Sequence, residues 1–375
     1  MRIAVNLLPF RQHLAGAGRY TQNILSELVA LDAANDYVLV VGARAVSHFA
    51  FDVPNVTQRV LNLSDALVAR IGYEQFVLPW LGPFDVLFTP SVAIPLGWRG
   101  KKVTVIYDMM AEHPALKKYP PLRSAYVRSM SRYAARHSDT IVTISENSRR
   151  EIATFARVPP EKILLAPPAT TLERVADEET LRLVRERYRL PERFILYVGT
   201  IEPGKNLPFL VRAYAALKRA HPDLTQHLVL AGSAGGGERA LENEIQKSDA
   251  SGFHQVGFVE QEDLAALYSL ADVFVYPSLY EGFGMPPLEA MACGTPVIVS
   301  NVSAMPEILG TLWSGKLAGL MASPNDEEAW ASAMDRVLTD ETFRESLRAL
   351  GLQRANEFSW KTSAQVIATA LQALD

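Results

Sequence analysis

The sequence predicts an α/β protein of two domains, each with a parallel sheet that helices cover on both faces. Three observations lead to this prediction. Short apolar runs of strand character alternate with helical patterns from the N-terminus onward, which is typical of parallel sheets. The same alternation starts again at Phe194, after a stretch rich in charged residues. The chain of 375 residues is also longer than a single hydrophobic core usually supports.

The first domain is expected at residues 1–170. Each strand is predicted from an apolar run bounded by polar, glycine or proline residues. The expected strands are 2–7, 37–41, 85–89, 103–107, 140–144 and 162–166, and the expected helices are 18–31, 65–81, a basic helix within 117–137, and 145–155. Ser145 precedes the last of these helices as its N-cap. Ligands of such a sheet bind at the C-terminal ends of the strands, so the loops that follow the strands are the places to look for a site.

The second domain is expected at residues 192–358, and residues 171–191 are expected to connect the two domains. The connection ends at a proline and has a charged, helical middle. Strands are expected from Phe194 onward, at 227–231, before Gly257, at 273–276 and at 297–300, with helices at 207–220, near Met305 and over about 327–358. Ser359 is expected to cap a final helix that ends near Leu374.

Composition excludes several classes of function. The net charge of −4 gives no case for binding nucleic acid. Cys293 is the only cysteine of the sequence, which excludes an internal disulfide framework and a zinc site of several cysteines. The first residues read as a strand rather than a signal peptide, and the most apolar long stretch, 76–88, is interrupted by Pro79 and Pro83. We therefore expect a cytoplasmic protein, attached at most to the inner surface of a membrane.

Residues 276–300 carry the strongest functional pattern. A buried strand ends at a proline, two glycines allow a turn, and a Pro-Pro pair opens a helix. The N–H groups and the dipole at a helix N-terminus favour an anion such as a phosphate. Glu281 and Glu289 stand on either side of this turn, and a carboxylate can accept hydrogen bonds from the paired hydroxyls of a ribose or a hexose. The pattern predicts a phosphate held between two sugar-binding acids.

Residues 281–297 resemble the signature of the retaining glycosyltransferases of family 4, E-G-F-G-x-P-x-L-E-A-M-A-x-G-x-P-V. The resemblance is strongest over residues 194–300 and covers nearly the whole chain. It implies the GT-B fold, in which two Rossmann-like, doubly wound domains face a central cleft and the last helix, 359–375, crosses back to the first domain. It also implies transfer of a hexose from a nucleotide diphosphate sugar to a glycan or lipid-linked acceptor, with no cofactor and no metal at the diphosphate.

The resemblance also implies roles for individual residues. The diphosphate would lie on the helix N-terminus, with Thr200 and Lys205 on its oxygens. Glu289 would hold the ribose and Glu281 the donor sugar, while Asp108 would contact donor or acceptor hydroxyls. Glu281 and Asp108 are thus the catalytic candidates. The full set expected to bind the donor is Gly16, Gly18, Thr200, Lys205, Phe258, Val259, Glu281, Gly282, Phe283, Gly284, Met285, Pro286 and Glu289.

Two parts of the expected donor site also have simpler explanations. Gly16 and Gly18 would close over the donor, and the alternative is a plain strand-to-helix turn; Thr21 replaces the third glycine of a dinucleotide fingerprint, which argues against a Rossmann cofactor site. The resemblance places Phe258 and Val259 at the nucleotide base, although they could equally be core residues at a strand end. Both explanations stay open at this point.

The family pattern is incomplete in this chain. Tyr107-Asp108 stands where His-Asp is common, and Gly204 stands where an arginine is common. The first departure puts any histidine-based role at Tyr107 in doubt, although His113 follows a few residues later and could partly substitute. Asp108 and His113 could equally be loop residues that bind the backbone.

The loop that carries Lys205 bears on the rival functions. Residues 199–205 match a phosphate-binding P-loop, G-x4-G-K, up to the last position, where Asn206 replaces the Ser or Thr that binds Mg²⁺. An NTPase is therefore the weaker alternative, and a noncatalytic sugar-nucleotide-binding protein on the same scaffold is the other. The E-P-x-K-N form of the loop resembles that of bacterial mannosyltransferases, which favours GDP-mannose as donor ahead of UDP- and dTDP-sugars.

A basic stretch spans Lys117 to His137, with six Lys and Arg residues and no acid. Arg128, Arg132 and Arg136 recur four residues apart and line one helix face. Such a helix can lie on an anionic membrane, so this stretch predicts a peripheral membrane contact. A solvated basic face, or a docking site for an anionic acceptor, explains the pattern equally well.

Overall fold

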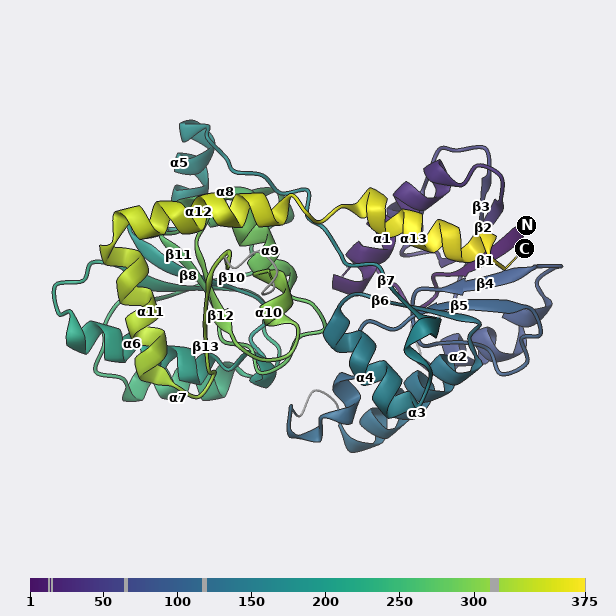
Figure 1. Ribbon diagram of the computed structural model, residues 1–375, viewed down its shortest axis with the longest axis horizontal. Coiled ribbons are helices and arrows are strands. Elements are labelled where there is room, and N and C mark those ends of the chain that lie inside the picture. Colours follow the sequence, from purple (N-terminus) through teal and green to yellow (C-terminus); the bar gives the residue numbers. More distant parts are fainter. Residues whose placement is uncertain (13, 15, 64–66, 117–119, 311–316, 375) are drawn as a thin grey trace. The chain divides into compact units, whose positions relative to one another are not determined.

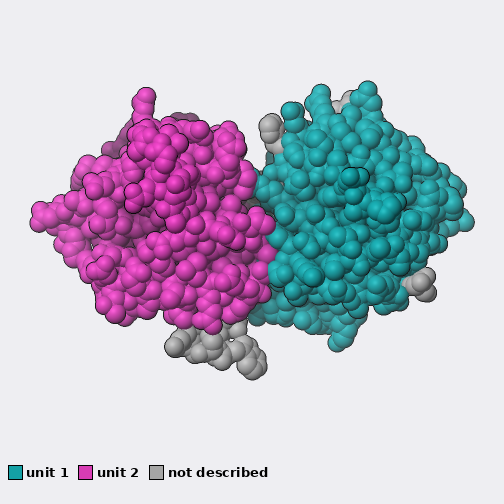
Figure 2. All heavy atoms as spheres, turned by 90° about the horizontal axis from the view of Figure 1, so that it is seen from above, with its two compact units in different colours: residues 1–114, 119–168, 359–375 teal, residues 115–118, 169–358 magenta. Residues whose placement is uncertain are grey.

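The computed structural model describes residues 1–375 except 13, 15, 64–66, 117–119, 311–316 and 375 (Figure 1). The chain forms two compact units. The N-terminal unit comprises residues 1–114, 119–168 and 359–375, and the C-terminal unit comprises residues 115–118 and 169–358 (Figure 2). Each unit is built on its own parallel sheet, which confirms the predicted α/β fold class. The final helix belongs to the N-terminal unit.

The described part of the N-terminal unit has a parallel sheet of seven strands in the order β3-β2-β1-β4-β5-β6-β7. The strands are β1 (Arg2–Asn6), β2 (Asp36–Gly42), β3 (Val56–Leu61), β4 (Val86–Thr89), β5 (Lys101–Val105), β6 (Thr140–Thr143) and β7 (Ile163–Leu165). Ile3 of β1 pairs with Tyr37 on one side and with Val86 on the other. The strand order therefore reverses beside β1, as in a doubly wound sheet.

Helices cover both faces of this sheet. They are α1 (Gly16–Leu31), α2 (Leu67–Phe76), α3 (Pro121–His137), α4 (Glu146–Ala156) and α13 (Trp360–Gln372), with 3-10 turns η1 (Val46–Phe49), η2 (Leu78–Trp80), η3 (Met110–Glu112), η4 (Pro114–Leu116) and η5 (Pro160–Lys162). Helices α1 and α13 lie side by side on one face, and α2, α3 and α4 lie on the other (Figure 1). Ser145 accepts a hydrogen bond from the Ser148 N–H at 3.0 Å, which confirms its predicted N-cap role.

The final helix packs into the N-terminal unit along its whole length, and the contacts of its first turns are specific. The Trp360 ring meets Tyr20 of α1 edge-on, with centroids 5.7 Å apart. Ser363 Oγ donates to the carbonyl oxygen of Pro167 at 2.6 Å, and the Tyr20 hydroxyl donates to that of Ala166 at 2.9 Å. The segment that follows β7 therefore holds both α1 and α13.

The described part of the C-terminal unit has a six-stranded parallel sheet in the order β10-β9-β8-β11-β12-β13. Its strands are β8 (Phe194–Val198), β9 (His227–Ala231), β10 (Phe253–Gly257), β11 (Val273–Tyr276), β12 (Val297–Ser300) and β13 (Leu320–Ala322). Its helices are α5 (Glu178–Arg187), α6 (Leu207–Ala220), α7 (Glu238–Lys247), α8 (Leu264–Leu270), α9 (Met285–Ala292), α10 (Met305–Ile308), α11 (Glu327–Thr339) and α12 (Glu341–Ala355), with 3-10 turns η6 (Pro203–Lys205) and η7 (Gln261–Asp263). Strands β11 and β12 are buried along their whole length, and they are continuous apolar runs for that reason.

Residues 171–191, which were expected to connect the domains, lie within the C-terminal unit. Helix α5 packs against α8. Arg187 Nη1 and the Tyr188 hydroxyl each donate to Asp263 Oδ2 at 2.7 Å. These contacts hold the segment on its own unit, and the structure divides the two units between residues 168 and 169.

The two units differ in charge. Residues 1–168 together with 359–375 contain 20 Lys and Arg against 14 Asp and Glu, whereas residues 169–358 contain 17 against 27. The overall charge of −4 therefore combines a basic N-terminal part with an acidic C-terminal part. In the part of the chain that the structure describes, no helix has the length and apolar character needed to cross a bilayer.

Candidate active site

The segment from β11 to α9 brings the predicted phosphate site to the end of a central strand. Helix α9 begins at Met285, with Gly284 before it. Gly284 has a φ of 125°, and a Cβ atom there would lie 2.3 Å from Met305 Cε. A side chain would therefore strain the backbone and crowd α10. Because Pro286 and Pro287 have no N–H group, the amides of Gly284 and Met285 are the donors that this helix N-terminus can offer an anion.

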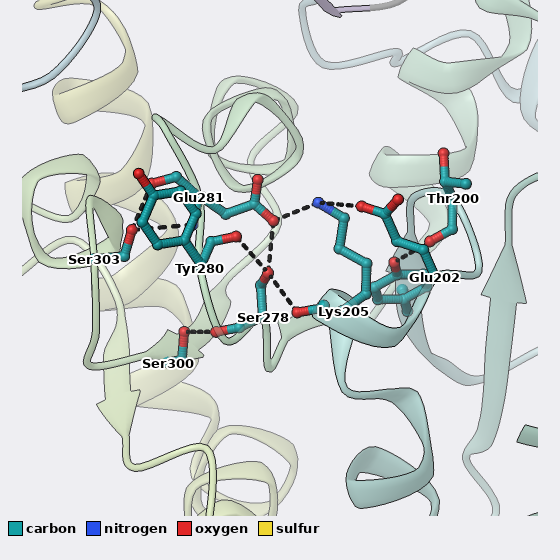
Figure 3. Close-up of polar contacts among 10 residues, drawn as sticks. Thr200, Glu202, Lys205, Ser278, Tyr280, Glu281, Ser300 and Ser303 are labelled. Atoms are coloured by element: carbon teal, nitrogen blue, oxygen red, sulfur yellow. Dashed lines mark hydrogen bonds and ion pairs between the residues drawn. The ribbon is translucent and has the colours of Figure 1, made fainter. Parts of the chain in front are cut away.

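Two loops of the C-terminal unit meet at Lys205 and Glu281 (Figure 3). Lys205 Nζ donates to Glu281 Oε1 at 2.5 Å, and Glu202 Oε1 lies 3.8 Å away on the other side. The three side chains are only 12–13% exposed. Burial lowers the pKa of Lys205, but the surrounding groups, with Glu281 first among them, together raise it by more, so the pKa lies above its ordinary value. Lys205 is therefore a cation held between two carboxyl groups.

Short hydrogen bonds fix the position of Glu281. The Leu279 N–H donates to the carbonyl oxygen of Gly204 at 2.9 Å, which ties the two loops together. Ser278 Oγ donates to Glu281 Oε1 at 2.6 Å. The Glu281 N–H donates to Ser303 Oγ at 3.0 Å, and the Ser303 hydroxyl donates to the Glu281 carbonyl oxygen (Figure 3). Sequence reasoning missed Ser278 and Ser303, because both lie outside the motif that contains Glu281.

Two tyrosines form a floor below Lys205. Lys205 Nζ lies 5.5 Å from the centroid of the Tyr276 ring, a cation–π distance, and Tyr276 stacks on Tyr197 with centroids 5.7 Å apart. Burial raises the pKa of both phenols well above its ordinary value, so they stay neutral. The Tyr197 hydroxyl donates to the Thr200 carbonyl oxygen at 3.2 Å. The exposed side chain of Thr200 thus lies at the edge of the group formed by Lys205, Glu202 and Glu281.

The structure shows the surroundings of Asn206 and Gly204, the two positions at which the Lys205 loop departs from the P-loop and family patterns. Asn206 has a φ of 58°, a left-handed conformation that suits asparagine, and its Nδ2 donates to the Pro324 carbonyl oxygen at 2.9 Å. A Cβ atom at Gly204 would meet no atom within 4 Å, so the absence of a side chain there is not a packing requirement. Glu202 is a further residue that sequence reasoning missed, although it is the acid of the E-P-x-K-N loop.

Glu289 lies in the second turn of α9 and is 8% exposed. The Tyr268 hydroxyl donates to Glu289 Oε2 at 2.9 Å. Burial raises the pKa of Tyr268 and the Glu289 carboxylate raises it further, so this hydroxyl remains a donor. Cys293, one turn later, is buried, and burial raises the pKa of its thiol to about 12. The thiol stays protonated at neutral pH, which fits a structural role.

The residues expected near the base and the donor lie in different environments. Phe258, which follows β10, is 60% exposed, whereas Val259 is 6% exposed. Phe283 is buried, and its ring meets Phe358 edge-on with centroids 5.5 Å apart. Gly282 is buried beside it. The Phe258 ring is therefore accessible to a ligand, while the side chains of Val259 and Phe283 belong to the packing of the unit.

The glycines expected in the N-terminal unit lie in the first turn of α1 rather than in a loop before it. A Cβ atom at Gly18 would lie 2.8 Å from Leu14 Cδ2, whereas one at Gly16 would meet no atom within 4 Å. Gly18 is therefore needed for close packing at the helix start. Gly16 leaves the surface at the start of α1 open.

Asp108 Oδ1 accepts a hydrogen bond from the Met110 N–H at 2.8 Å and so stabilises the turn into η3. Asp108 Oδ1 therefore binds the backbone, which is the alternative to a contact with substrate hydroxyls. The Tyr107 hydroxyl lies 3.0 Å from Thr21 Oγ1 and 3.2 Å from the Ala17 carbonyl oxygen, so the ring packs toward α1. His113, the expected substitute for a histidine at position 107, lies instead against Glu151, with Nε2 2.9 Å from Oε1.

Arg128, Arg132 and Arg136 form the predicted basic stripe on α3, and two of these three arginines bind other parts of the protein. Arg132 binds Glu112 through two hydrogen bonds of 2.7 Å. Arg136 Nε donates to the carbonyl oxygen of Ala156 at 2.9 Å. The first residues of the predicted stretch, Lys117 and Lys118, lie outside the described residues. The stripe as a whole is therefore not a row of solvated charges.

Comparison with known proteins places both units in one group of enzymes. The family described as glycosyl transferases group 1 matches residues 184–354, and the glycosyl transferase 4-like domain matches residues 15–169. The chain is 34% identical to the O-antigen chain mannosyltransferase B of Escherichia coli over 378 residues, which cover 96% of this chain and 97% of that protein.

Two solved structures show that the fold is shared more widely. Sucrose-phosphate synthase from Thermosynechococcus elongatus matches with a TM-score of 0.75 and 20% identity, covering 100% of this chain and 98% of that one. The Anabaena protein HepE in complex with UDP-glucose matches with a TM-score of 0.74 and 17% identity, covering 100% of both chains. At these identities the similarity concerns the fold alone.

Proposed function

Because the chain belongs to glycosyltransferase family 4, we propose that it moves a hexose from a nucleotide diphosphate sugar to a hydroxyl group of a glycan or lipid-linked acceptor. The observation that carries the proposal is the buried Lys205–Glu281 pair in front of helix α9. A cation and the backbone amides of a helix N-terminus are suited to a diphosphate. An adjacent carboxylate is suited to sugar hydroxyls.

The proposed donor complex is built around the Lys205–Glu281 pair. The diphosphate would accept hydrogen bonds from the amides of Gly284 and Met285, from Lys205 Nζ and from the Thr200 hydroxyl. Lys205 would exchange its bond to Glu281 for bonds to phosphate oxygens, so that Glu281 becomes available to the hexose. Glu289 would hold the ribose in the same complex. Phe258, at the exposed end of β10, is the side chain proposed to meet the base.

We propose that the reaction retains the configuration at the anomeric carbon. The bond between that carbon and the diphosphate oxygen breaks, and the acceptor oxygen bonds to the carbon on the same face. The proton of the acceptor hydroxyl passes to the departing phosphate oxygen. Lys205 and the amides before α9 would stabilise the charge of the leaving diphosphate. This electrostatic role replaces a metal in the proposal.

The donor and acceptor are proposed from two separate indications. The E-P-x-K-N loop and the 34% identity to a mannosyltransferase support mannose as the hexose, with GDP as its carrier. That relative is named for an O-antigen chain, which supports a glycan as the acceptor. A noncatalytic protein would bind the same donor without transferring its sugar.

Thermal unfolding with GDP, UDP, dTDP and ATP, each with Mg²⁺ and with EDTA, tests the donor site. A ligand at 100 times its dissociation constant adds about 2.7 kcal/mol of stability, which raises the melting temperature by about 5–10 °C for domains of this size. We expect the largest shift with GDP and the same shift in EDTA. A shift that requires both ATP and Mg²⁺ would show instead that residues 199–205 act as a phosphate loop.

Transfer of mannose from GDP-mannose to a mannose-terminated oligosaccharide tests catalysis. The expected product carries an α-linked mannose, because the donor is α-linked and the configuration is retained; NMR of the product establishes the linkage. Intact GDP binding without transfer to any acceptor would favour the noncatalytic alternative.

A further inference from the structure

We propose that Tyr107 is a positioning residue, whose hydroxyl holds the first turn of helix α1 in the arrangement that binds the donor sugar. The proposal deepens the proposed function and rests on it, because it takes the start of α1, with Gly16 and Gly18, as the part that closes over the donor. It gives a role to the tyrosine that stands where the family pattern commonly has a histidine.

The Tyr107 side chain connects three segments at one edge of the N-terminal sheet. Tyr107 stands two residues after the end of β5, and its hydroxyl donates to the carbonyl oxygen of Pro90, directly after β4, at 3.1 Å. The same hydroxyl lies 3.0 Å from Thr21 Oγ1 and 3.2 Å from the Ala17 carbonyl oxygen, both of α1. Ligands of a parallel sheet bind at this edge. Tyr107 therefore ties α1 to the place where a substrate is expected.

The hydroxyl of Tyr107 is a donor with several acceptors around it. Burial raises the pKa of Tyr107 above its ordinary value, so the hydroxyl keeps its proton at neutral pH. The Thr21 hydroxyl donates to the Ala17 carbonyl oxygen at 2.8 Å, and its oxygen can still accept the Tyr107 proton. One phenol can thus bond to the loop after β4 or to the first turn of α1 without moving its ring.

The ring of Tyr107 has partners of its own. It meets the Tyr20 ring edge-on, with centroids 5.4 Å apart, and Tyr20 meets Trp360 of α13 edge-on at 5.7 Å. Tyr20 is buried, and its hydroxyl donates to the Ala166 carbonyl oxygen at 2.9 Å. The ring of Tyr107 therefore packs on the aromatic contact between α1 and α13, whereas its hydroxyl alone reaches the first turn of α1.

The first turn of α1 is the part of this helix that gains most from an outside contact. The helix begins at Gly16, where a Cβ atom would meet nothing within 4 Å, and Gly18 follows two residues later. Glycine weakens a helix relative to other residues, and the first N–H groups of a helix have no partner within it. Bonds from Tyr107 to Ala17 and Thr21 therefore fix the direction of N–H groups that the donor can use.

A histidine at position 107 would lack these contacts. The bonds to Pro90, Ala17 and Thr21 are all made by the phenol oxygen, which extends beyond the ring, and a histidine side chain ends at its ring. Position 107 thus acts on the donor through α1 and not through a proton of its own.

Calorimetric titration of the full chain with GDP and with GDP-mannose, in the absence of acceptor, tests the proposal. Tyr107→Phe keeps the ring and removes the hydroxyl. It should weaken binding of GDP-mannose about tenfold, because the first turn of α1 loses its bonds. The dissociation constant of GDP should stay within about twofold, because the residues proposed for the diphosphate and the ribose belong to the C-terminal unit. A purely structural defect would not separate the two nucleotides.

Tyr20→Phe is the matched control. It also removes one buried hydroxyl from the aromatic contact of α1, but that hydroxyl binds Ala166 and not the first turn, so both affinities should stay near wild type. Thr21→Val completes a double-mutant cycle with Tyr107→Phe. The loss in the double variant should be smaller than the product of the two single losses, because both substitutions remove the same contact.

Hydrogen exchange gives a readout that needs no ligand. Peptides from the start of α1 should exchange faster in Tyr107→Phe than in the wild type or in Tyr20→Phe, because only the first variant releases that turn. Tyr107→His should resemble Tyr107→Phe in both exchange and affinity, since it also lacks the hydroxyl.

Three results would overturn the positioning role while leaving the proposed function in place: Tyr107→Phe binds GDP-mannose as the wild type does, it weakens GDP and GDP-mannose equally, or Tyr107→His binds GDP-mannose at least as tightly as the wild type. The last result would make position 107 a direct contact of the sugar. A wild-type chain that binds neither nucleotide would overturn the proposed function, and the positioning role with it.

Discussion

Lys205 shows how neighbouring side chains hold a buried cation in place. The ammonium group lies between Glu281 and Glu202 and above the Tyr276 ring. Removing one partner of a buried ion pair typically costs about 3–5 kcal/mol, because the remaining charge stays buried. Glu281 therefore has two roles in our proposal: it positions Lys205 in the empty site, and it serves the donor sugar in the occupied one.

The two acids of the motif should respond differently to substitution. Glu289→Ala should weaken GDP binding about tenfold or more, because it removes the carboxylate that we propose accepts hydrogen bonds from the ribose. Glu281→Ala should mainly lower kcat, about a hundredfold, because it removes the contact that we propose Glu281 makes with the hexose during transfer. Isothermal titration with GDP and steady-state kinetics with GDP-mannose measure the two effects.

Tyr268→Phe provides the control for Glu289→Ala. It removes the hydroxyl that donates to Glu289 but leaves the carboxylate, so GDP binding should change much less than in Glu289→Ala. If the turnover loss falls on Glu289→Ala and the binding loss on Glu281→Ala, the two roles are exchanged.

At the scale of single residues, the sequence predicts which side chains are site candidates better than it predicts which of them contact one another. The motif made Glu281 and Lys205 site candidates, but nothing in the sequence indicates that they form an ion pair across a separation of 76 residues. Ser303 was missed for the same reason, because its hydroxyl contacts Glu281 only where the loops after β11 and β12 lie together. Ser278 is three residues from Glu281, but nothing in the sequence indicates that its hydroxyl binds that carboxylate. Contacts of this kind depend on the fold, whereas the motif is local.

At the scale of elements, the turn before α9 depends on a backbone conformation that glycine alone adopts readily. Gly284 combines a φ of 125° with a Cβ position next to Met305. Met305 could move away, but the backbone strain of about 1–3 kcal/mol would remain. This turn sets the direction of the Gly284 and Met285 N–H groups. A change in its backbone conformation would therefore turn these proposed phosphate-binding donors away from the phosphate.

Gly284→Ala should therefore weaken GDP binding about tenfold and lower the melting temperature. Gly204→Ala is the matched control on the facing loop, because its Cβ atom meets nothing within 4 Å; both stability and GDP affinity should stay near wild type. Calorimetry and titration with GDP measure both variants. Equal losses in the two would mean that the conformation of Gly284 has no special role.

Secondary structure was predictable where an element is fully buried or strongly amphipathic. The predicted strands 227–231, 273–276 and 297–300 agree with β9, β11 and β12, because central strands are continuous apolar runs. Strands β3 and β13 were not predicted: β3 is half exposed along its length, and β13 has three residues. Such strands are stabilised by hydrogen bonds to a neighbouring strand, and the local sequence does not indicate that this strand is adjacent.

At the scale of the whole molecule, each unit has its own core, and a tryptophan reports on each. Trp360 packs on Tyr20 in the N-terminal unit, whereas Trp330 packs on Phe209 in the C-terminal unit. Trp330 is completely buried, and its Nε1 donates to the Ser323 carbonyl oxygen at 2.9 Å. Removal of either ring leaves a cavity in one unit.

Trp360→Ala should destabilise the N-terminal unit by about 3 kcal/mol, and Trp330→Ala should do the same to the C-terminal unit. Hydrogen exchange measured on peptides locates the effect. We expect faster exchange in β1, β6 and β7 for Trp360→Ala, and in β8, β11 and β12 for Trp330→Ala. Equal acceleration in both sheets by either variant would show that the units unfold as one.

The path of the chain through the two units has a consequence for synthesis. The C-terminal unit is, apart from residues 115–118, one continuous segment, 169–358, whereas the N-terminal unit also requires residues 359–375. During translation the first 168 residues leave the ribosome long before α13 exists to pack on α1. The unit that is begun first is therefore completed last, and until then the α1 face that α13 covers is exposed to the chaperones that meet a nascent chain.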